Sequence, residues 1–158
     1  MAAVPLVLCG KSPMMAKSFI AGLDGADYKV IHACHTLETA LLEIPALLRG
    51  ESITPASDLS TVSATNTVSI PKAVVIGKGF SSDEMHEIIR AGDADAKGRV
   101  AWLLPDDDKF TAYMKAKALL SVGTLLPTVI ADRVKICLGE HGLRAGSDDV
   151  KGGGVWEF

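Results

Sequence analysis

Hydrophobic residues in this chain fall into short continuous runs, which alternate with segments where apolar residues recur every three or four positions. A short apolar run bounded by turn residues is typical of a strand buried on both faces, whereas the longer spacing is typical of an amphipathic helix. We therefore predict four strands, each followed by a helical segment. The predicted strands occupy residues 6–9, 28–33, 72–77 and 99–104.

The first two helical segments carry clear start and break signals. Ser12 can cap the first helix, and Pro13 fits its first turn. Glycines at 22 and 25 should end that helix, because glycine adopts the backbone angles of a helix terminus. The second segment, 36–48, contains Pro45, which should kink or split the helix because its ring removes a backbone hydrogen bond.

The third helical segment begins with a capping box, in which Ser81 precedes Glu84 by three residues. We expect this helix to end at Gly92 and a polar loop to follow over residues 93–98. Further helical patterns cover residues 110–120 and 127–141.

Alternating strands and helices predict right-handed βαβ units around a parallel sheet with helices on both faces. The expected fold is one small three-layer α/β domain, flavodoxin-like or minimal Rossmann-like, with strand order 2-1-3-4. A tail over 146–158 ends in Val155-Trp156-Glu157-Phe158, and these aromatics should dock as an edge strand or against a partner. A Ser/Thr-rich excursion at 50–69 is expected to be either a lid or surface decoration.

Composition narrows the class of protein. The 158 residues are 48% hydrophobic and 22% charged, with a net charge of −3 and only 5% aromatic residues. Scattered basic residues and few aromatics argue against nucleic-acid binding. The N-terminus lacks a basic segment typical of a signal peptide, and no apolar run is long enough for a membrane span. Three cysteines do not form a disulfide framework, so we expect a cytoplasmic protein with reduced thiols.

Two predicted strand ends supply the leading candidate site. In doubly wound sheets, ligands bind where the strand order reverses, here between the first and third strands. Both turns combine glycine, lysine and a hydroxyl residue before a helix N-terminus, a combination that favours an anion. The alternative is that these are ordinary strand-to-helix turns. The candidate ligand-binding residues are Gly10, Lys11, Ser12, Gly77, Lys78, Gly79 and Phe80.

The sequence does not identify the ligand, because the motifs that define known nucleotide-binding sites are absent. Gly10-Lys11-Ser12 resembles the end of a P-loop but lacks the earlier glycine, and a dinucleotide site would need three spaced glycines. The usual NAD fingerprint is therefore absent, and the cofactor is unknown. We expect a small anionic or nucleotide-type ligand.

Cysteine and histidine residues offer a second hypothesis, a cysteine-dependent enzyme. Cys9 and Cys34 end neighbouring predicted strands, and His35 follows directly, so these three residues are the candidate catalytic groups. The same residues, with His32, are metal-ligand types. We nevertheless expect no metal site here, because buried cysteine is usually a small core residue.

Four stretches resemble a group of small fungal α/β proteins: VLCGKSPMMAKSF, YKVIHACHTLETALLEIPALLRGE, AVVIGKGFSSDEM and the terminal VWEF. The resemblance covers most of the chain apart from the Ser/Thr-rich excursion and residues 107–126. It implies a single Rossmann-like domain of uncharacterised function and transfers no catalytic residue. A third hypothesis rests on the apolar tail: the protein is a non-catalytic interaction module, a homodimer in which the tail of one copy docks across its neighbour.

Overall fold

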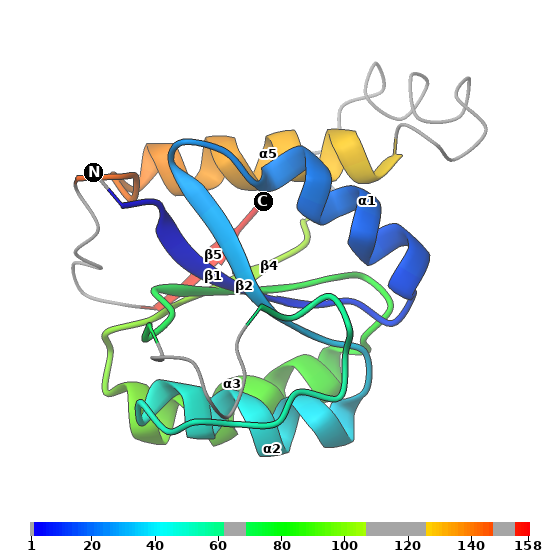
Figure 1. Ribbon diagram of the computed structural model, residues 1–158, viewed down its shortest axis with the longest axis vertical. Coiled ribbons are helices and arrows are strands. Elements are labelled where there is room, and N and C mark those ends of the chain that lie inside the picture. Colours follow the sequence, from blue (N-terminus) through cyan, green and yellow to red (C-terminus); the bar gives the residue numbers. More distant parts are fainter. Residues whose placement is uncertain (1, 62–68, 107–125, 147–153) are drawn as a thin grey trace.

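The computed structural model describes residues 2–61, 69–106, 126–146 and 154–158. A five-stranded sheet runs through the centre of the molecule in the order β2-β1-β3-β4-β5, and each neighbouring pair is parallel (Figure 1). The predicted α/β class and the order 2-1-3-4 are thus confirmed. The strands are β1 (Val4–Cys9), β2 (Tyr28–Cys34), β3 (Ala73–Ile76), β4 (Ala101–Leu104) and β5 (Gly154–Glu157).

The C-terminal tail supplies the edge strand β5, as one of the two alternatives predicted. Trp156 and Phe158 are buried against the sheet, and the Phe158 amide donates to Leu104 O at 3.0 Å. Burying two aromatic side chains offsets the entropy lost when the tail is ordered.

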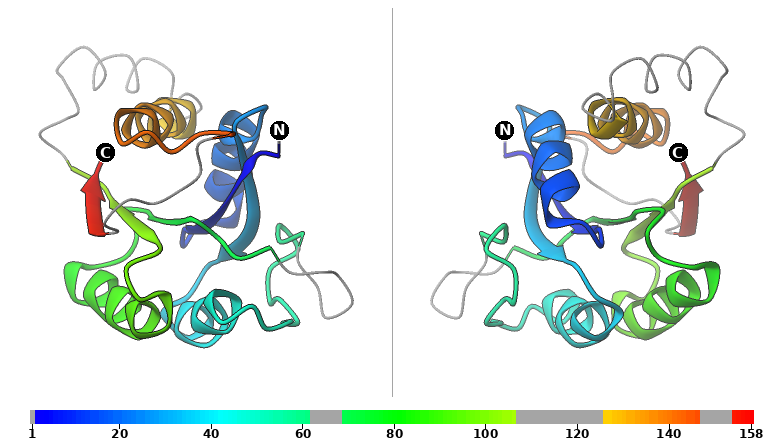
Figure 2. Two further views of the ribbon diagram at one scale, coloured as in Figure 1. Left: turned by 90° about the vertical axis from the view of Figure 1, so that its left-hand side faces the viewer. Right: turned by 90° about the vertical axis from the view of Figure 1, so that its right-hand side faces the viewer.

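Two pairs of helices cover the two faces of the sheet, which makes three layers (Figure 2). α1 (Pro13–Leu23) packs beside α5 (Leu126–Glu140) on one face, and α2 (Leu37–Leu48) packs beside α3 (Ser82–Ala96) on the other. Each face has its own apolar core, because every central strand is buried on both sides. Among the described residues, every helix is too short or too polar to cross a lipid bilayer.

The predicted end of the third helix at Gly92 is wrong. α3 continues to Ala96, and Lys97 and Gly98 end it with φ angles of 52° and 76°. Gly92 lies inside the helix, where it faces the indole of Trp102 on β4. An added Cβ would stand 2.3 Å from that ring, so a larger residue would not fit. This glycine lets helix and strand approach closely, so it serves packing and does not mark a terminus.

Pro45 does not split the second helix. α2 is continuous over its twelve residues, with Pro45 buried one turn from its end. The missing amide removes one hydrogen bond, but Arg49 N still donates to Pro45 O at 3.1 Å. The buried side chains of Ile44, Leu47 and Leu48, which flank the proline in sequence, pack the last turn of the helix into the core. The predicted helix over 110–120 lies outside the described residues.

The first part of the Ser/Thr-rich excursion is docked on the outer edge of β2. Thr61 N donates to Ile31 O at 2.9 Å, and Ala33 N donates to Ser60 Oγ at 3.0 Å. These bonds satisfy backbone groups that an edge strand would otherwise expose. Residues 53–61 are here called the edge loop, and the end of this loop is held against β2 by these hydrogen bonds.

Candidate functional site

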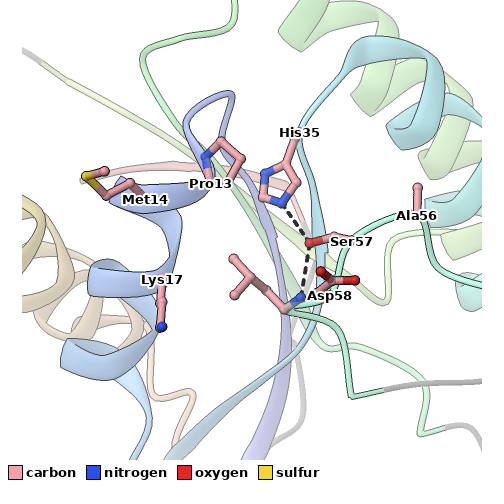
Figure 3. Close-up of a pocket in the computed structure, with 8 residues that line it drawn as sticks. Pro13, Met14, Lys17, His35, Ala56, Ser57 and Asp58 are labelled. Atoms are coloured by element: carbon pink, nitrogen blue, oxygen red, sulfur yellow. Dashed lines mark hydrogen bonds between the residues drawn. The ribbon is translucent and has the colours of Figure 1, made fainter.

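An open pocket of about 430 Å³ lies beyond the carboxyl ends of β1 and β2 (Figure 3). One wall is the first turn of α1, and the opposite wall is the edge loop. His35, the first residue after β2, lies between these walls. The residues that line the pocket are Pro13, Met14, Lys17, His35, Ala56, Ser57, Asp58 and Leu59.

His35 is fixed by two short hydrogen bonds. Its Nδ1 lies 2.7 Å from Gly10 O, and its Nε2 lies 2.7 Å from Ser57 Oγ. Because a carbonyl oxygen only accepts, Nδ1 carries a proton and Nε2 of the neutral ring accepts from the Ser57 hydroxyl. The Ser57 oxygen in turn accepts from Leu59 N at 3.2 Å. Serine, imidazole and backbone carbonyl thus form one oriented chain.

The walls of the pocket differ in charge and polarity. Lys17 and the side chain of Met14, which is 82% exposed, project from α1 (Figure 3). Asp58 projects from the edge loop, and among the described residues neither Lys17 nor Asp58 forms an ion pair. The pocket therefore offers a cation, an anion, a polar floor and an exposed apolar surface.

The predicted crevice between β1 and β3 is organised differently, because its lysine is already paired. Lys11 Nζ lies 2.9 Å and 3.0 Å from the two carboxylate oxygens of Glu84, and 5.0 Å from the centre of the Phe80 ring. Ser81 N donates to the same carboxylate, completing the predicted capping box. The Ser81 amide and the Lys11 ammonium hold the pKa of Glu84 below its ordinary value.

The predicted backbone donors at this crevice are also engaged. Gly10 N donates to Cys34 O at 2.9 Å, and Gly77 N donates to Cys9 O at 2.8 Å. Ser12 Oγ accepts from Met15 N as the cap of α1. Gly79 faces the Lys11 side chain, where an added Cβ would meet it at 3.2 Å. Lys78 is exposed in the same turn.

The predicted trio of Cys9, Cys34 and His35 does not form one cluster. Cys9 and Cys34 are register partners on β1 and β2, both buried in the core beneath α2 and α3, whereas His35 faces the pocket. Hydrogen bonding to the Cys9 thiol and burial raise the pKa of the Cys34 thiol far above its ordinary value. A buried, protonated thiol is the opposite of what a nucleophilic cysteine needs.

His32 and Glu43 join Cys34 in a buried cluster instead. His32 Nε2 lies 2.9 Å from Glu43 Oε1 and 3.3 Å from Cys34 Sγ, and Cys34 Sγ lies 3.9 Å from Glu43 Oε1. The His32 side chain is fully buried, and the Glu43 side chain is 7% exposed. Burial raises the pKa of the Glu43 carboxyl, a shift that the Ala56 amide partly opposes.

The edge loop closes over this cluster with hydrogen bonds of its own. Ser60 Oγ lies 2.9 Å from His32 Nδ1, and Ala56 N donates to Glu43 Oε2 at 3.3 Å. The same loop carries Ser57 to the pocket. One short segment therefore supplies polar groups both to the pocket and to the buried cluster.

Sequence patterns did not single out Lys17, Glu43 or Ser57. A signal for Glu43 was present, because Ala40, Glu43, Ile44 and Leu47 share the helix spacing of a buried face, and a carboxylate there needs a partner. Ser57 stands among many serines and threonines, and only the tertiary fold distinguishes it.

Comparison with known proteins gives one distant similarity. The chain is 29% identical over 147 residues to Kojic acid related protein 6 of Aspergillus oryzae, a match that covers 93% of this chain and 83% of that protein. This similarity agrees with the resemblance to fungal proteins. No protein-family model matches the chain, and no solved structure matches it.

Proposed function

We propose that this protein binds a small metabolite bearing a carboxylate or phosphate in the pocket between α1 and the edge loop. The observation that carries the proposal is the pocket itself, which opens at the carboxyl ends of β1 and β2 with about 430 Å³ of space. Ligands of α/β proteins bind beyond the carboxyl ends of the strands, typically at the reversal between β1 and β3. This pocket lies beyond the carboxyl ends of β1 and β2, and its volume is within the usual range for small-molecule sites.

Charge and polarity support an anionic ligand. Lys17 stands at the wall formed by α1, and the N-terminal turn of that helix favours negative charge. His35 and Ser57, which are hydrogen-bonded to each other, make part of the lining polar, while Met14 offers an apolar surface. Asp58 on the opposite wall would exclude ligands whose second end is also negative, which is a source of selectivity.

The pocket is a better candidate than the β1/β3 crevice because its cation is available. An anion at the crevice would have to displace Glu84 from Lys11, and the amides of Gly10 and Gly77 already have partners. Binding at the crevice through Lys11 and Lys78 is the competing hypothesis, and the experiment described next distinguishes the two sites.

A thermal-shift screen of the full chain tests the proposal. The probes are nucleoside monophosphates, phosphorylated sugars, small carboxylic acids and kojic acid, the last because of the relative's name. A true ligand should raise the melting temperature of the wild type and of Lys11→Ala with Lys78→Ala. Lys17→Ala should lose most of the shift, and Ala56→Trp should lose it by filling the pocket.

The Lys17 variant and the Lys11/Lys78 double variant serve as controls for one another, because both remove exposed positive charge near the carboxyl ends of the strands. A shift that survives both Lys17→Ala and Ala56→Trp but disappears in the Lys11/Lys78 double variant would refute the pocket and support the crevice. Absence of any stabilising probe across these ligand classes would count against an anionic metabolite.

The hydrogen-bonded chain from Ser57 through His35 to Gly10 O favours a second candidate, ester hydrolysis. Ser57 Oγ would attack the ester carbonyl carbon while its proton moves to His35 Nε2, and that proton would then pass to the leaving alcohol. Water, activated by the same imidazole, would release the acid and restore the serine. The Gly10 carbonyl would orient the ring, as a carboxylate does in serine hydrolases.

Turnover of p-nitrophenyl acetate measures this activity directly. Wild type should hydrolyse the ester faster than Ser57→Ala and His35→Gln, and a fluorophosphonate probe should label Ser57. Ser60→Ala is the control, because this serine belongs to the same loop but contacts His32. Equal rates in wild type and Ser57→Ala would rule out hydrolysis while leaving ligand binding intact.

A further inference from the structure

We propose that His32, Cys34 and Glu43 form a zinc site beneath the edge loop, a site separate from the pocket. Among the described residues, these three bring their ligand atoms within 4.8 Å of one another, and all three are buried. Imidazole nitrogen, thiolate sulfur and carboxylate oxygen together suit a borderline ion such as Zn²⁺ rather than Mg²⁺ or Ca²⁺.

The spacing of the three side chains fits a tetrahedral ion. Zinc bonds of about 2.0–2.3 Å at tetrahedral angles place nitrogen and oxygen ligands about 3.4 Å apart, and a sulfur about 3.6 Å from either. The distances here are 2.9 Å between His32 Nε2 and Glu43 Oε1, 3.3 Å between His32 Nε2 and Cys34 Sγ, and 3.9 Å between Cys34 Sγ and Glu43 Oε1. Side-chain shifts of about half an ångström would therefore admit the ion.

Ser60 is placed to orient the histidine. For His32 Nε2 to bind a metal, Nδ1 must carry the proton and donate it to an acceptor. Ser60 Oγ lies 2.9 Å from Nδ1 and can accept from it, while its own hydroxyl points to Ala33 O at 3.4 Å. A histidine held by an outer hydrogen bond in this way is the usual arrangement at zinc centres.

A hydrogen bond from the edge loop also orients the Glu43 carboxyl group. Its second oxygen accepts from Ala56 N at 3.3 Å, so Oε1 stays turned toward His32 and Cys34. The Cys9 thiol, on the register partner of Cys34, lies beside Cys34 on the same face of the sheet. A zinc ion at this point would join β2 to α2, and the free energy of binding it would add to the stability of the fold.

The competing explanation is a metal-free hydrogen-bond network that holds the edge loop, and metal content separates the two. The whole 158-residue chain, produced in zinc-supplemented medium and purified with a non-chelating reductant, should carry about one zinc per chain. Cys34→Ala should lose it, whereas Cys137→Ala should retain it. Cys137 is the matched control because it is also buried and its sulfur lies 4.0 Å from His141 Nδ1.

Cobalt substitution then identifies the ligands. The wild type should show a thiolate-to-cobalt charge-transfer band and the visible bands of a tetrahedral centre. Cys34→Ala should lose the charge-transfer band, and Glu43→Gln should shift the visible bands. Ser60→Ala, a positioning residue, should bind about 10- to 100-fold more weakly while keeping the charge-transfer band.

Absence of zinc from wild-type protein that also takes up no cobalt would overturn the proposal, as would equal zinc content in Cys34→Ala. If Cys34→Ala fails to fold, alkylation of the wild type in mild denaturant gives the answer. Zinc should slow alkylation of Cys34 relative to Cys137, and equal protection of both cysteines would also overturn the site.

Discussion

On one face of the sheet, α1 and α5 cover a mainly apolar core, and one polar group at its margin, the Tyr28 hydroxyl, donates to Leu143 O at 2.6 Å. On the other face, α2 and α3 cover an apolar core that also holds His32 and Glu43. Trp102 lies there too, with its indole nitrogen buried and without a hydrogen-bond partner among the described residues.

The difference shows where this protein departs from simple packing. A purely apolar face can be filled by any complementary set of side chains, but buried ionisable groups persist only where their partners are fixed. On the α2/α3 face those partners come from the edge loop, whose Ala56 and Ser60 contact Glu43 and His32. Ser57 of the same loop contacts His35, so a single loop contacts both the polar core and the pocket.

Removing the buried Glu43 carboxyl group from the polar face should have the largest effect on stability. Glu43→Ala leaves His32 and the Ala56 amide without their acceptor, and we expect a loss of about 3 kcal/mol in the free energy of unfolding. Urea denaturation measures it. Glu87→Ala on the exposed side of α3 is the control and should stay within about 0.5 kcal/mol of wild type. Equal midpoints for the two variants would show that the buried pair contributes nothing.

Alanine substitutions at two helical glycines, one on each face of the sheet, should give the next largest difference in stability. An added Cβ at Gly92 would lie 2.3 Å from Trp102, whereas at Gly22 it would lie 3.2 Å from Ala131 Cβ. We expect Gly92→Ala to cost about 2 kcal/mol through overpacking. Gly22→Ala should remain within about 1 kcal/mol of wild type, because better helix propensity offsets the tight contact.

A double-variant cycle identifies the cause of the Gly92 effect. In a Trp102→Phe background the smaller ring leaves room for the new methyl group, so Gly92→Ala should cost clearly less there. An unchanged cost would mean that the helix itself, and not the indole, rejects alanine.

Tyr28→Phe probes the apolar face and should have a smaller effect. Loss of the bond to Leu143 O should lower the free energy of unfolding by about 1 kcal/mol at neutral pH. Burial and the nearby Asp27 raise the pKa of Tyr28 above 10.0, so the folded state holds the phenol proton more tightly than the unfolded chain. This contribution is complete below pH 10.0 and is lost as the pH rises through the folded pKa.

Chemical denaturation at neutral and alkaline pH tests the tyrosine prediction. The stability difference between wild type and Tyr28→Phe should shrink above pH 10.0. A difference that grows with alkalinity would mean that the tyrosine hydroxyl is not held as a buried donor.

The fold followed from sequence because its signals are local. Alternating apolar runs specify the strands, and the caps at Ser12 and Ser81 are short-range patterns that the structure confirms. Gly92 shows the limit, since the residue that explains it, Trp102, belongs to the next strand and no helix signal encodes their contact.

The candidate sites were much less predictable because they depend on contacts between distant residues. Sequence placed Lys11 at a strand end, but its partner Glu84 lies 73 residues away. Likewise, His35 meets Ser57 only because the edge loop returns to β2. A charged residue at the carboxyl ends of the strands is therefore not always free to bind a ligand. Whether it can do so depends on whether it already forms an ion pair within the protein.

Glu84→Gln tests that last point and should have the smallest effect. The Ser81 amide and Lys11 lower the pKa of Glu84, so the carboxylate stabilises the fold above its ordinary value of 4.5, and this stability is lost as the pH falls through the folded pKa. Wild type should therefore melt slightly higher than Glu84→Gln at neutral pH. The difference should narrow below pH 4.5 and in high salt, because the ion pair is exposed. Glu87→Gln on the same helix should show neither trend. A gap that widens toward acid would mean that Lys11 is not held by Glu84, and the crevice would again compete with the pocket for an anion.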